Sequence, residues 1–237
     1  MRRLIFSLLV TLVSAQALAL TPFTAVYDAK FRGLKASNQL TLSAADDSGR
    51  IEYRSVSKAR GLARLLKSDP IVEYTRFEEV DHKFRPIEYH YLFNSRGSKR
   101  NARIIFNQDD SVANSVYKTQ SVDLDIQSEH VDRLLEQLVF RADLAAGTVA
   151  EKYPYIDRNA LREAAYEKLG TETVETKAGS FDTVKYRRQR VGSRRSAIIW
   201  FAPELEFLPV RIQHFEGDKS TGYAVLKRYA LGSVTPR

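Results

Sequence analysis

The chain has 237 residues, with 37 Lys and Arg against 29 Asp and Glu, which gives a formal net charge of +8. The hydrophobic fraction of 43% is too high for a disordered chain. The absence of Cys excludes a disulfide scaffold, thiol catalysis, thiolate metal sites and a lipid-modified N-terminal cysteine.

The first 19 residues have the parts of a secretory signal peptide. A positive start at Arg2–Arg3 precedes an apolar run over residues 4–13, and Ala17 and Ala19 occupy the two small positions that signal peptidase reads. The apolar run is about half of the ~20 residues that a membrane-spanning helix needs, which disfavours the alternative of an uncleaved anchor. We therefore expect cleavage after Ala19 and release of residues 20–237 into the periplasm as a single domain without a lipid anchor.

Most of the remaining chain alternates between apolar and polar residues. Phe23, Ala25 and Tyr27 share one face of such a segment, and Tyr89 and Tyr91 share one face of another. This period of two predicts antiparallel strands with one buried face. The predicted strands are residues 23–32, 37–45, 50–58, 71–80, 83–93, 100–107, 112–118, 150–157, 162–168, 171–176, 181–191, 194–202, 207–216 and 221–231. Their short spacing predicts a mainly β fold, with an antiparallel curved sheet, a half-barrel or barrel, or a sandwich.

Residues 129–146 break this alternation. Leu134 and Leu138 belong to an apolar set at helical spacing, Ser128 precedes the segment as a candidate N-cap, and Gly147 follows it as a C-terminal stop. We therefore expect the sheet to wrap around one long amphipathic helix over residues 129–146.

The sequence contains no pattern typical of an enzyme. The four histidines, at positions 82, 90, 130 and 214, lack metal-ligand spacing, and no GxSxG, GxGxxG or Walker A string occurs. Asp123 and Asp125 could supply paired acids for glycoside hydrolysis, although solvated turn residues are the simpler interpretation. We predict no catalytic residue, no metal site and no cofactor, and an envelope hydrolase is the third hypothesis.

Two groups of residues are candidates for ligand binding. Basic residues flank a predicted turn at Gly192–Ser193, and they are Lys185, Arg187, Arg188, Arg190, Arg194 and Arg195. Such a cluster is either a solvated edge that resists aggregation or an anion-binding surface. The second group is an apolar patch of Leu62, Leu65 and Leu66, which we expect at the lip of a cavity within the sheet.

Three longer strings stand out for their composition. They are SKARGLARLL at residues 57–66, AGSFDTVK at 178–185 and WFAPELEFLPVRI at 200–212. With the segments at 22–25 and 32–36, they resemble the exported proteobacterial family catalogued as domain of unknown function 3108. That resemblance implies no activity. It implies a β-rich shape similar to that of the periplasmic lipoprotein carriers, in which helices close a half-barrel over an apolar cavity.

Our first hypothesis is a non-enzymatic periplasmic protein that binds an amphiphilic or anionic component of the cell envelope. A lipid-like ligand would lie in the sheet cavity, with the leucine patch at its lip and the basic hairpin against an anionic headgroup or membrane surface. The alternative is an interaction module with a filled core. The expected partners are envelope lipid, lipopolysaccharide, peptidoglycan or an envelope protein, with peripheral membrane contact and no nucleic acid. An open or a filled interior distinguishes the two hypotheses.

Overall fold

The structure is a computed structural model that describes residues 21–61, 69–95 and 98–232. The predicted signal peptide, with Ala17 and Ala19, lies outside the described residues, as do Leu62, Leu65 and Leu66.

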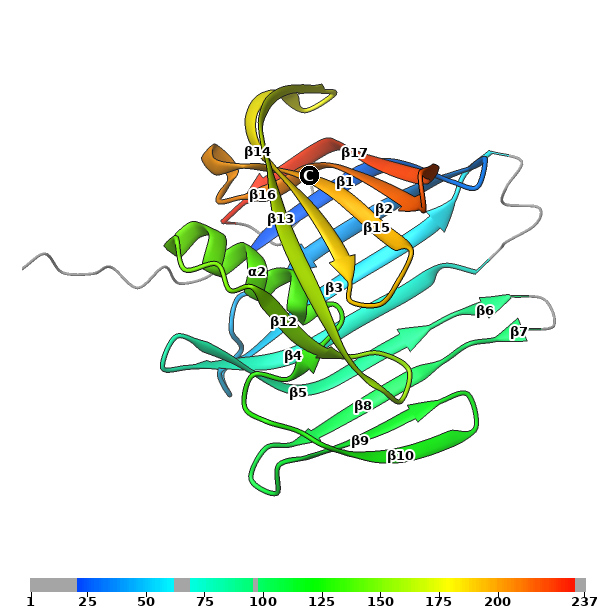
Figure 1. Cartoon of the computed structure of the whole chain (residues 1–237), viewed down its shortest axis with the longest axis vertical. Helices are drawn as coiled ribbons and strands as arrows, with labels where there is room; N and C mark the ends of the chain where they lie inside the picture. Colours follow the sequence, from blue (N-terminus) through cyan, green and yellow to red (C-terminus); the bar gives the residue numbers. More distant parts are fainter. Residues whose placement is uncertain (1–20, 62–68, 96–97, 233–237) are drawn as a thin grey trace, which may run out of the picture.

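Almost all the strands join into one large sheet (Figure 1). In chain order its strands are β1 (Phe23–Phe31), β2 (Leu34–Leu42), β3 (Arg50–Ala59), β4 (Ile71–Val80), β5 (Lys83–Leu92), β8 (Ala102–Asn107), β9 (Val112–Tyr117), β10 (Gln120–Asp125), β11 (Val131–Asp132), β12 (Lys152–Ile156), β13 (Leu161–Thr176), β14 (Gly179–Arg190), β15 (Arg195–Ala202), β16 (Leu208–Glu216) and β17 (Lys219–Leu231). Their spatial order is β10-β9-β8-β5-β4-β3-β2-β1-β17-β16-β15-β14-β13-β12-β11. A separate small ribbon pairs β6 (Asn94–Ser95) with β7 (Ser98–Lys99). The expectation of a mainly β, antiparallel fold is confirmed.

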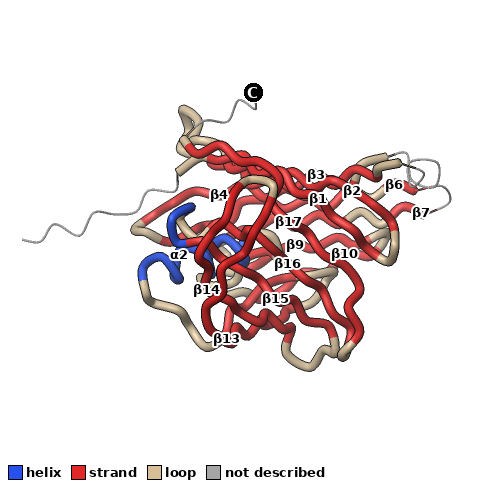
Figure 2. The backbone as a smooth tube through the Cα atoms, turned by 90° about the horizontal axis from the view of Figure 1, so that it is seen from above, coloured by secondary structure: helices blue, strands red, loops and turns tan. Residues whose placement is uncertain are grey.

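The sheet is strongly curled, as the view from above shows (Figure 2), and its end at β9 and β10 lies beside the β12–β13 turn at the other end. No backbone ladder joins these ends among the described strands, so the sheet is a barrel-like wrap with a seam. Asn159, in the tight turn between β12 and β13, bridges the seam with its side chain. Its amide oxygen accepts a hydrogen bond from the Ser115 hydroxyl of β9 at 2.9 Å, and its amide nitrogen donates to the Gln120 carbonyl of β10 at 3.0 Å.

The predicted strands agree with the structure except at four places. Two predicted strands, at 162–168 and 171–176, are one continuous strand, β13, because a bulge between Lys168 and Gly170 absorbs the break in the pattern. The pattern also misses β10, the two-residue β11 and the small ribbon of β6 and β7.

The helix α2 (Leu135–Ala146) is shorter than the predicted 129–146 and lies at one end of the curled sheet, so the picture of a sheet wrapped around a long helix is not borne out (Figure 1). The Asp132 carboxylate accepts hydrogen bonds from the backbone N–H groups of Leu134 and Leu135, at 2.9 and 3.0 Å, and this fixes where the helix begins. Ser128 is not the cap, since its hydroxyl bonds to Glu129. Gly147 does end the helix, with a left-handed φ of 73°.

An aromatic cluster attaches α2 to the inner face of the sheet. Phe140, which is fully buried, stacks on Tyr166 of β13 with ring centroids 3.5 Å apart. It also meets Tyr153, Tyr186 and Phe201, from β12, β14 and β15, at centroid distances of 5.2 to 5.6 Å. One helical side chain therefore packs against four strands.

The string at 200–212 forms a second attachment point for α2. A short 3-10 helix, η1 (Pro203–Leu205), separates β15 from β16, and Glu206 and Phe207 follow with φ values of 52° and 58°. This turn presents the Glu206 carbonyl to Arg141 of α2, whose Nε donates to it at 2.7 Å. The most distinctive string in the sequence therefore has a structural role.

Candidate ligand cavity

The inner face of the sheet changes in side-chain size from one end to the other. Near α2, large residues fill it: Tyr53, Leu42 and Phe23 lie side by side on β3, β2 and β1, and all are buried. Six residues further along, at the third inward-facing position, each of the same three strands carries an alanine.

These alanines form a continuous row across four neighbouring strands. The register pairs Ala59 of β3 with Ala36 of β2, Ala36 with Ala29 of β1, and Ala29 with Ala224 of β17. Ile212 of β16 extends the row beyond Ala224. Because an alanine side chain ends at Cβ, the row leaves space where longer side chains on a tightly curved sheet would meet.

A cavity of about 570 Å³ occupies this space. Its lining includes the alanine row, and Tyr53, Tyr155 and the first turns of α2, at Leu134 and Gln137, also border it. The volume lies within the roughly 300–1,000 Å³ typical of small-molecule sites. The interior is therefore open at one end of the sheet and filled at the α2 end.

Charged groups among the lining residues are paired with acids on the inner elements. Arg133 meets Glu73 of β4, with Nε and Oε1 2.9 Å apart. Arg188 of β14 binds the fully buried carboxylate of Glu136 on α2, at 2.6 Å between Nη2 and Oε2. These two arginines are neutralised and held in place, so they add little net charge to the cavity.

The mouth of the cavity carries cations without such partners. Arg190 lies on the inward face of β14, whereas Lys30, Lys35 and Lys58 alternate with the inward alanines and project from the outer face at the rim. Among the described residues the side chains of these four form no ion pair or hydrogen bond. Arg195 also lines the cavity and approaches Glu216 at 3.4 Å. The cavity thus has a neutral interior and a positively charged mouth.

His214 of β16 is the one histidine among the described residues that lines this cavity. Partial desolvation between the cavity walls, and then the positive charges of Arg188 and Arg133, lower the pKa of its imidazole. The ring is therefore neutral near pH 7, and it supplies a hydrogen-bonding group rather than a charge.

The structure distributes the predicted basic hairpin over both faces of the sheet. Arg188 and Arg190 line the cavity. Arg195 borders it at the turn, beside Glu216. The other three predicted cations lie elsewhere: Arg187 pairs with Glu167 at 2.8 Å, Lys185 pairs with Glu172 at 3.0 Å, and the Arg194 guanidinium lies next to Gly217. The six residues do not form one charged surface, because successive side chains on a strand point to opposite sides.

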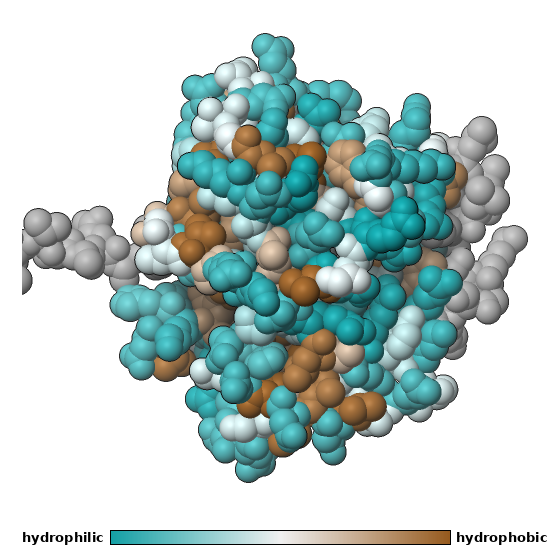
Figure 3. Space-filling model, viewed as in Figure 1, coloured by the Kyte–Doolittle hydropathy of each residue, from teal (hydrophilic) through white to brown (hydrophobic). Residues whose placement is uncertain are grey.

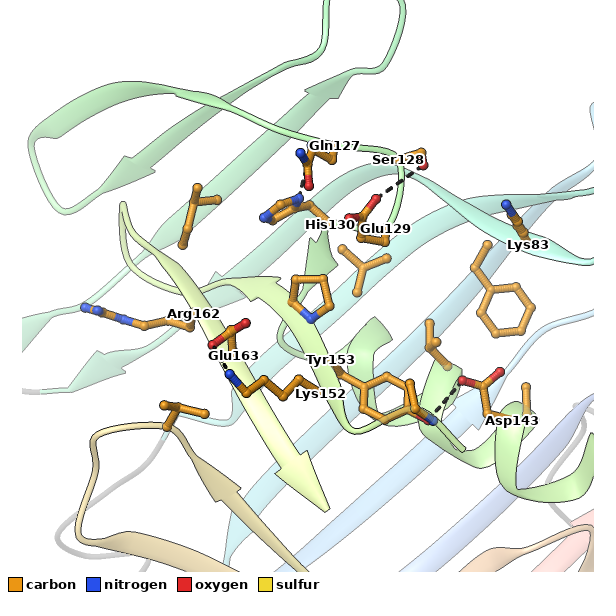
Figure 4. Close-up of a pocket in the computed structure, with 18 of the residues that line it drawn as sticks. Lys83, Gln127, Ser128, Glu129, His130, Asp143, Lys152, Tyr153, Arg162 and Glu163 are labelled. Atoms are coloured by element: carbon orange, nitrogen blue, oxygen red, sulfur yellow. Dashed lines mark hydrogen bonds and ion pairs between the residues drawn. The ribbon is translucent and has the colours of Figure 1, made fainter. Parts of the chain in front are cut away.

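A second hollow, of about 750 Å³, lies outside the sheet between α2, β12 and the β4–β5 turn (Figure 4). Several of its labelled polar groups are engaged with one another: the Tyr153 hydroxyl donates to Asp143 at 2.9 Å and Lys152 meets Glu163 at 3.3 Å. Lys83 and Arg162 also line it, and their side chains form no ion pair or hydrogen bond with the described residues. The groove therefore carries charges of both signs, and two of its cations have no acidic partner.

The residues considered for catalysis do not converge. The described residues contain no group of three or more His, Asp or Glu placed to hold a metal ion. Asp123 is exposed and accepts a hydrogen bond from Asn114. Asp132 is fully buried and is occupied with the start of α2 and with the Thr75 hydroxyl at 2.6 Å. The absence of catalytic residues stays a prediction.

The outer surface is mainly hydrophilic on the face shown in Figure 3, with hydrophobic side chains gathered in separate patches. Among the described residues, no helix has the length and apolar character needed to cross a membrane.

The comparison with a solved β-barrel-like structure shows the same kind of fold. The β-barrel-like protein of domain of unknown function DUF1849 from Brucella abortus matches with a TM-score of 0.58 at 10% identity, over 90% of this chain and 98% of that one. A candidate lipoprotein from Parabacteroides distasonis matches at 0.37 and 10% identity, covering 89% and 96%. A Bacteroides fragilis protein with a YmcC-like fold matches at 0.32 and 14%, covering 89% and 94%. At these identities the likeness concerns the fold alone.

The sequence comparison confirms the suspected family. No curated protein matches the chain. The family described as "Protein of unknown function (DUF3108)" matches residues 26–222, which include three of the four alanines of the row and most of the cavity lining. The chain belongs to the DUF3108 family.

Proposed function

We propose that this protein binds an anionic amphiphile inside its curved sheet, as a non-enzymatic component of the cell envelope. The observation that carries the proposal is the alanine row, which opens a cavity of about 570 Å³ beneath a mouth of unpartnered cations. The signal-peptide pattern of residues 1–19 supports a periplasmic location.

The two parts of the cavity suit the two parts of such a ligand. Apolar surface from Ala29, Ala36, Ala224 and Ile212 would contact the hydrocarbon portion and gain about 25 cal/mol for each Å² removed from water. The anionic group would stay at the mouth, because Arg133 and Arg188 already have acidic partners. Arg190 is the cation best placed for it, since it lies on the same face of β14 as Arg188, lines the cavity and has no acidic partner among the described residues.

The open interior favours this proposal over an interaction module with a filled core. A module of that kind needs large side chains along the whole inner face, whereas here they stop near Tyr53 and Tyr27 and give way to alanines. The outer groove is a weaker candidate, because it lies outside the sheet and its acids Asp143 and Glu163 already bind Tyr153 and Lys152.

The first experiment blocks the cavity without changing its charge. Ala36→Phe and Ala224→Phe place rings in the alanine row, and Ala146→Phe, on the exposed last turn of α2, is the matched control. We expect the unsubstituted protein and the control to bind a fluorescent long-chain carboxylate, and the two cavity variants to lose at least tenfold in affinity while keeping their circular dichroism spectra. Equal binding by all four proteins would refute the proposal.

The second experiment tests where the anionic group lies. Arg190→Gln should weaken binding of a long-chain carboxylate more than binding of the corresponding alcohol. Lys185→Gln is the control, because Lys185 lies on the same strand but pairs with Glu172 outside the cavity. Native mass spectrometry of protein isolated from its own periplasm would identify a bound molecule. Empty protein that also fails to bind the probe would rule the proposal out.

A further inference from the structure

The tip of the β1–β2 hairpin carries large apolar side chains that project into solvent. Arg32 and Gly33, with φ values of 47° and 86°, form the two-residue turn. Phe31 and Leu34 face each other across it and are 54% and 38% exposed. Tyr223 of the neighbouring β17 is 45% exposed. Phe31 and Leu34 lie on the same face as the alanine row, whereas Tyr223, which pairs with Lys30, lies on the opposite face. All three border the cavity at the hairpin tip.

The position of Phe31 is fixed by Gly222 on β17, the residue opposite it in the sheet. A Cβ atom at Gly222 would lie 2.6 Å from the Lys30 carbonyl oxygen and 2.9 Å from the Phe31 ring. Only glycine therefore lets the ring lie against the neighbouring strand. Gly222 therefore leaves the space that the Lys30 carbonyl and the Phe31 ring occupy at this edge of the mouth.

Two lysines face each other one residue pair before Phe31 and Leu34, on the opposite face of the hairpin. The register pairs Lys30 with Lys35, an arrangement that destabilises a sheet through like-charge repulsion. No described acid relieves it: Asp28, two residues away on β1, is already paired with Lys177 at 2.7 Å and Arg60 at 3.2 Å. Lys58 adds a third unpartnered cation at the same mouth.

We infer that this hairpin tip docks on an anionic lipid bilayer, with Phe31, Leu34 and Tyr223 in the headgroup region and the lysines against the lipid charges. Exposed aromatic and aliphatic side chains next to lysines favour that interface, because the rings enter the boundary layer while the long lysine stems keep their charges at its surface. A protein partner would have to supply acids to match three cations that this chain leaves unpaired, and an anionic membrane presents such charges everywhere.

Docking in this orientation turns the mouth of the cavity toward the lipid. An amphiphile could then pass between the bilayer and the alanine row without crossing water. This consequence rests on the proposed function, whereas the docking itself depends on the hairpin tip alone.

The experiment measures co-sedimentation with vesicles of phosphatidylcholine, with and without phosphatidylglycerol, at low and high salt. We expect binding to the anionic vesicles only, and release by salt. Lys30→Gln with Lys35→Gln should weaken it about 30-fold, since each lysine near such a surface contributes about fivefold. Phe31→Ser should weaken it about tenfold.

A matched control exists at the other end of the sheet (Figure 1). The β4–β5 turn has the same construction, with Val80, which is 44% exposed, paired with Lys83 across two residues of positive φ. Val80→Ser with Lys83→Gln should leave vesicle binding unchanged. Ala36→Phe, which blocks the cavity, should also leave it unchanged, so a failure of ligand binding and a failure of docking are distinguishable.

Several outcomes would overturn the inference. Equal binding of the tip variants and the unsubstituted protein would place the contact elsewhere. Binding to neutral vesicles that salt does not affect would remove the role of the lysines. Absence of vesicle binding, together with intact binding of the carboxylate probe, would refute docking alone. A dimer that Phe31→Ser dissociates in analytical ultracentrifugation, with no vesicle binding, would assign the tip to contact between copies of this chain.

Discussion

Phe140 is the side chain on which the attachment of α2 to the sheet depends most. It is fully buried, and four aromatic rings from β12, β13, β14 and β15 surround it. Phe140→Ala removes the ring and leaves a hole between the helix and the sheet. The helix also borders the ligand cavity through Leu134 and Gln137, so this variant tests whether the closed end of the fold depends on one residue.

The expected loss of stability follows from these contacts. Truncating a buried Phe to Ala costs about 3–5 kcal/mol, including the cavity that remains. Aromatic pairs contribute about 0.5–1.5 kcal/mol each beyond area, which favours the upper part of that range. The better helix propensity of Ala offsets about 0.5 kcal/mol. We therefore expect a loss of about 4 kcal/mol, and a melting temperature lower by about 8–16 °C for a domain of this size.

Equilibrium unfolding in urea measures this loss. Trp200, the single Trp of the chain, is 5% exposed and reports through its fluorescence on the sheet beside Phe201. Val139→Ala, the neighbouring position on α2 that faces the outer groove, is the control and should cost about 1 kcal/mol. If Phe140→Ala cost no more than Val139→Ala, the aromatic cluster would not hold the helix and the account of the closed end would be wrong.

Three further changes test the buried polar groups and the seam. Glu136→Gln leaves the Arg188 guanidinium without its buried counter-ion and should cost about 3 kcal/mol, whereas Glu136→Met with Arg188→Met should recover most of that loss in the same urea assay. Burial raises the pKa of the Asp132 carboxyl to about 7, so between about pH 4 and 7 the folded state retains a proton that the unfolded state releases. The contribution of Asp132 to the free energy of unfolding therefore falls as pH rises through that range, and Asp132→Asn should lack that fall. If the unfolding free energies of the variant and the unsubstituted protein changed equally with pH, the raised pKa of Asp132 would be contradicted. Asn159→Ala removes both side-chain hydrogen bonds across the seam and should cost about 1–2 kcal/mol of unfolding free energy. It should also speed hydrogen exchange in β9 and β10. Unchanged exchange there would show that the seam closes without Asn159.

Strand positions could be predicted because one face of almost every strand meets the interior, which leaves a period of two in the sequence. The pattern fails where that condition fails. β10 is the edge strand and is exposed along most of its length, so its alternation carries no burial. In β13 the pattern breaks at Gly170, but the bulge restores the ladder and the strand continues. Neither a bulge nor an edge is visible in hydropathy alone.

The start of α2 was misplaced for a different reason. Helical spacing of leucines extends N-terminal to residue 135, but the backbone of Asp132 forms a β-bridge with Ile156. The Asp132 side chain also caps the helix. A carboxylate bonded to two backbone N–H groups depends on local geometry, and Ser128 satisfied the sequence rule equally well. A tertiary contact therefore decides between two acceptable caps.

The alanine row illustrates what sequence does and does not contain about the candidate site. Each alanine is visible as a small residue at an inward position, but their adjacency depends on the register of four strands. Register between β1 and β17 joins residues almost 200 positions apart, and a bulge at Val26 shifts it. A cavity made from such a row can be recognised only once the strands are paired.

The charges are different, because their arrangement was accessible from the sequence. Residues on one strand alternate between faces, so Lys185 and Arg187 must point away from Arg188 and Arg190 wherever the sheet lies. A two-residue turn at Arg32–Gly33 likewise forces Lys30 opposite Lys35. Local pairing of this kind also shows which cations have an acid on the neighbouring strand. By that criterion the sequence favours the cations at the mouth over those of the hairpin at 185–195. The cations that matter most for binding are those that the fold leaves unpaired, and in this chain they surround the opening above the alanine row.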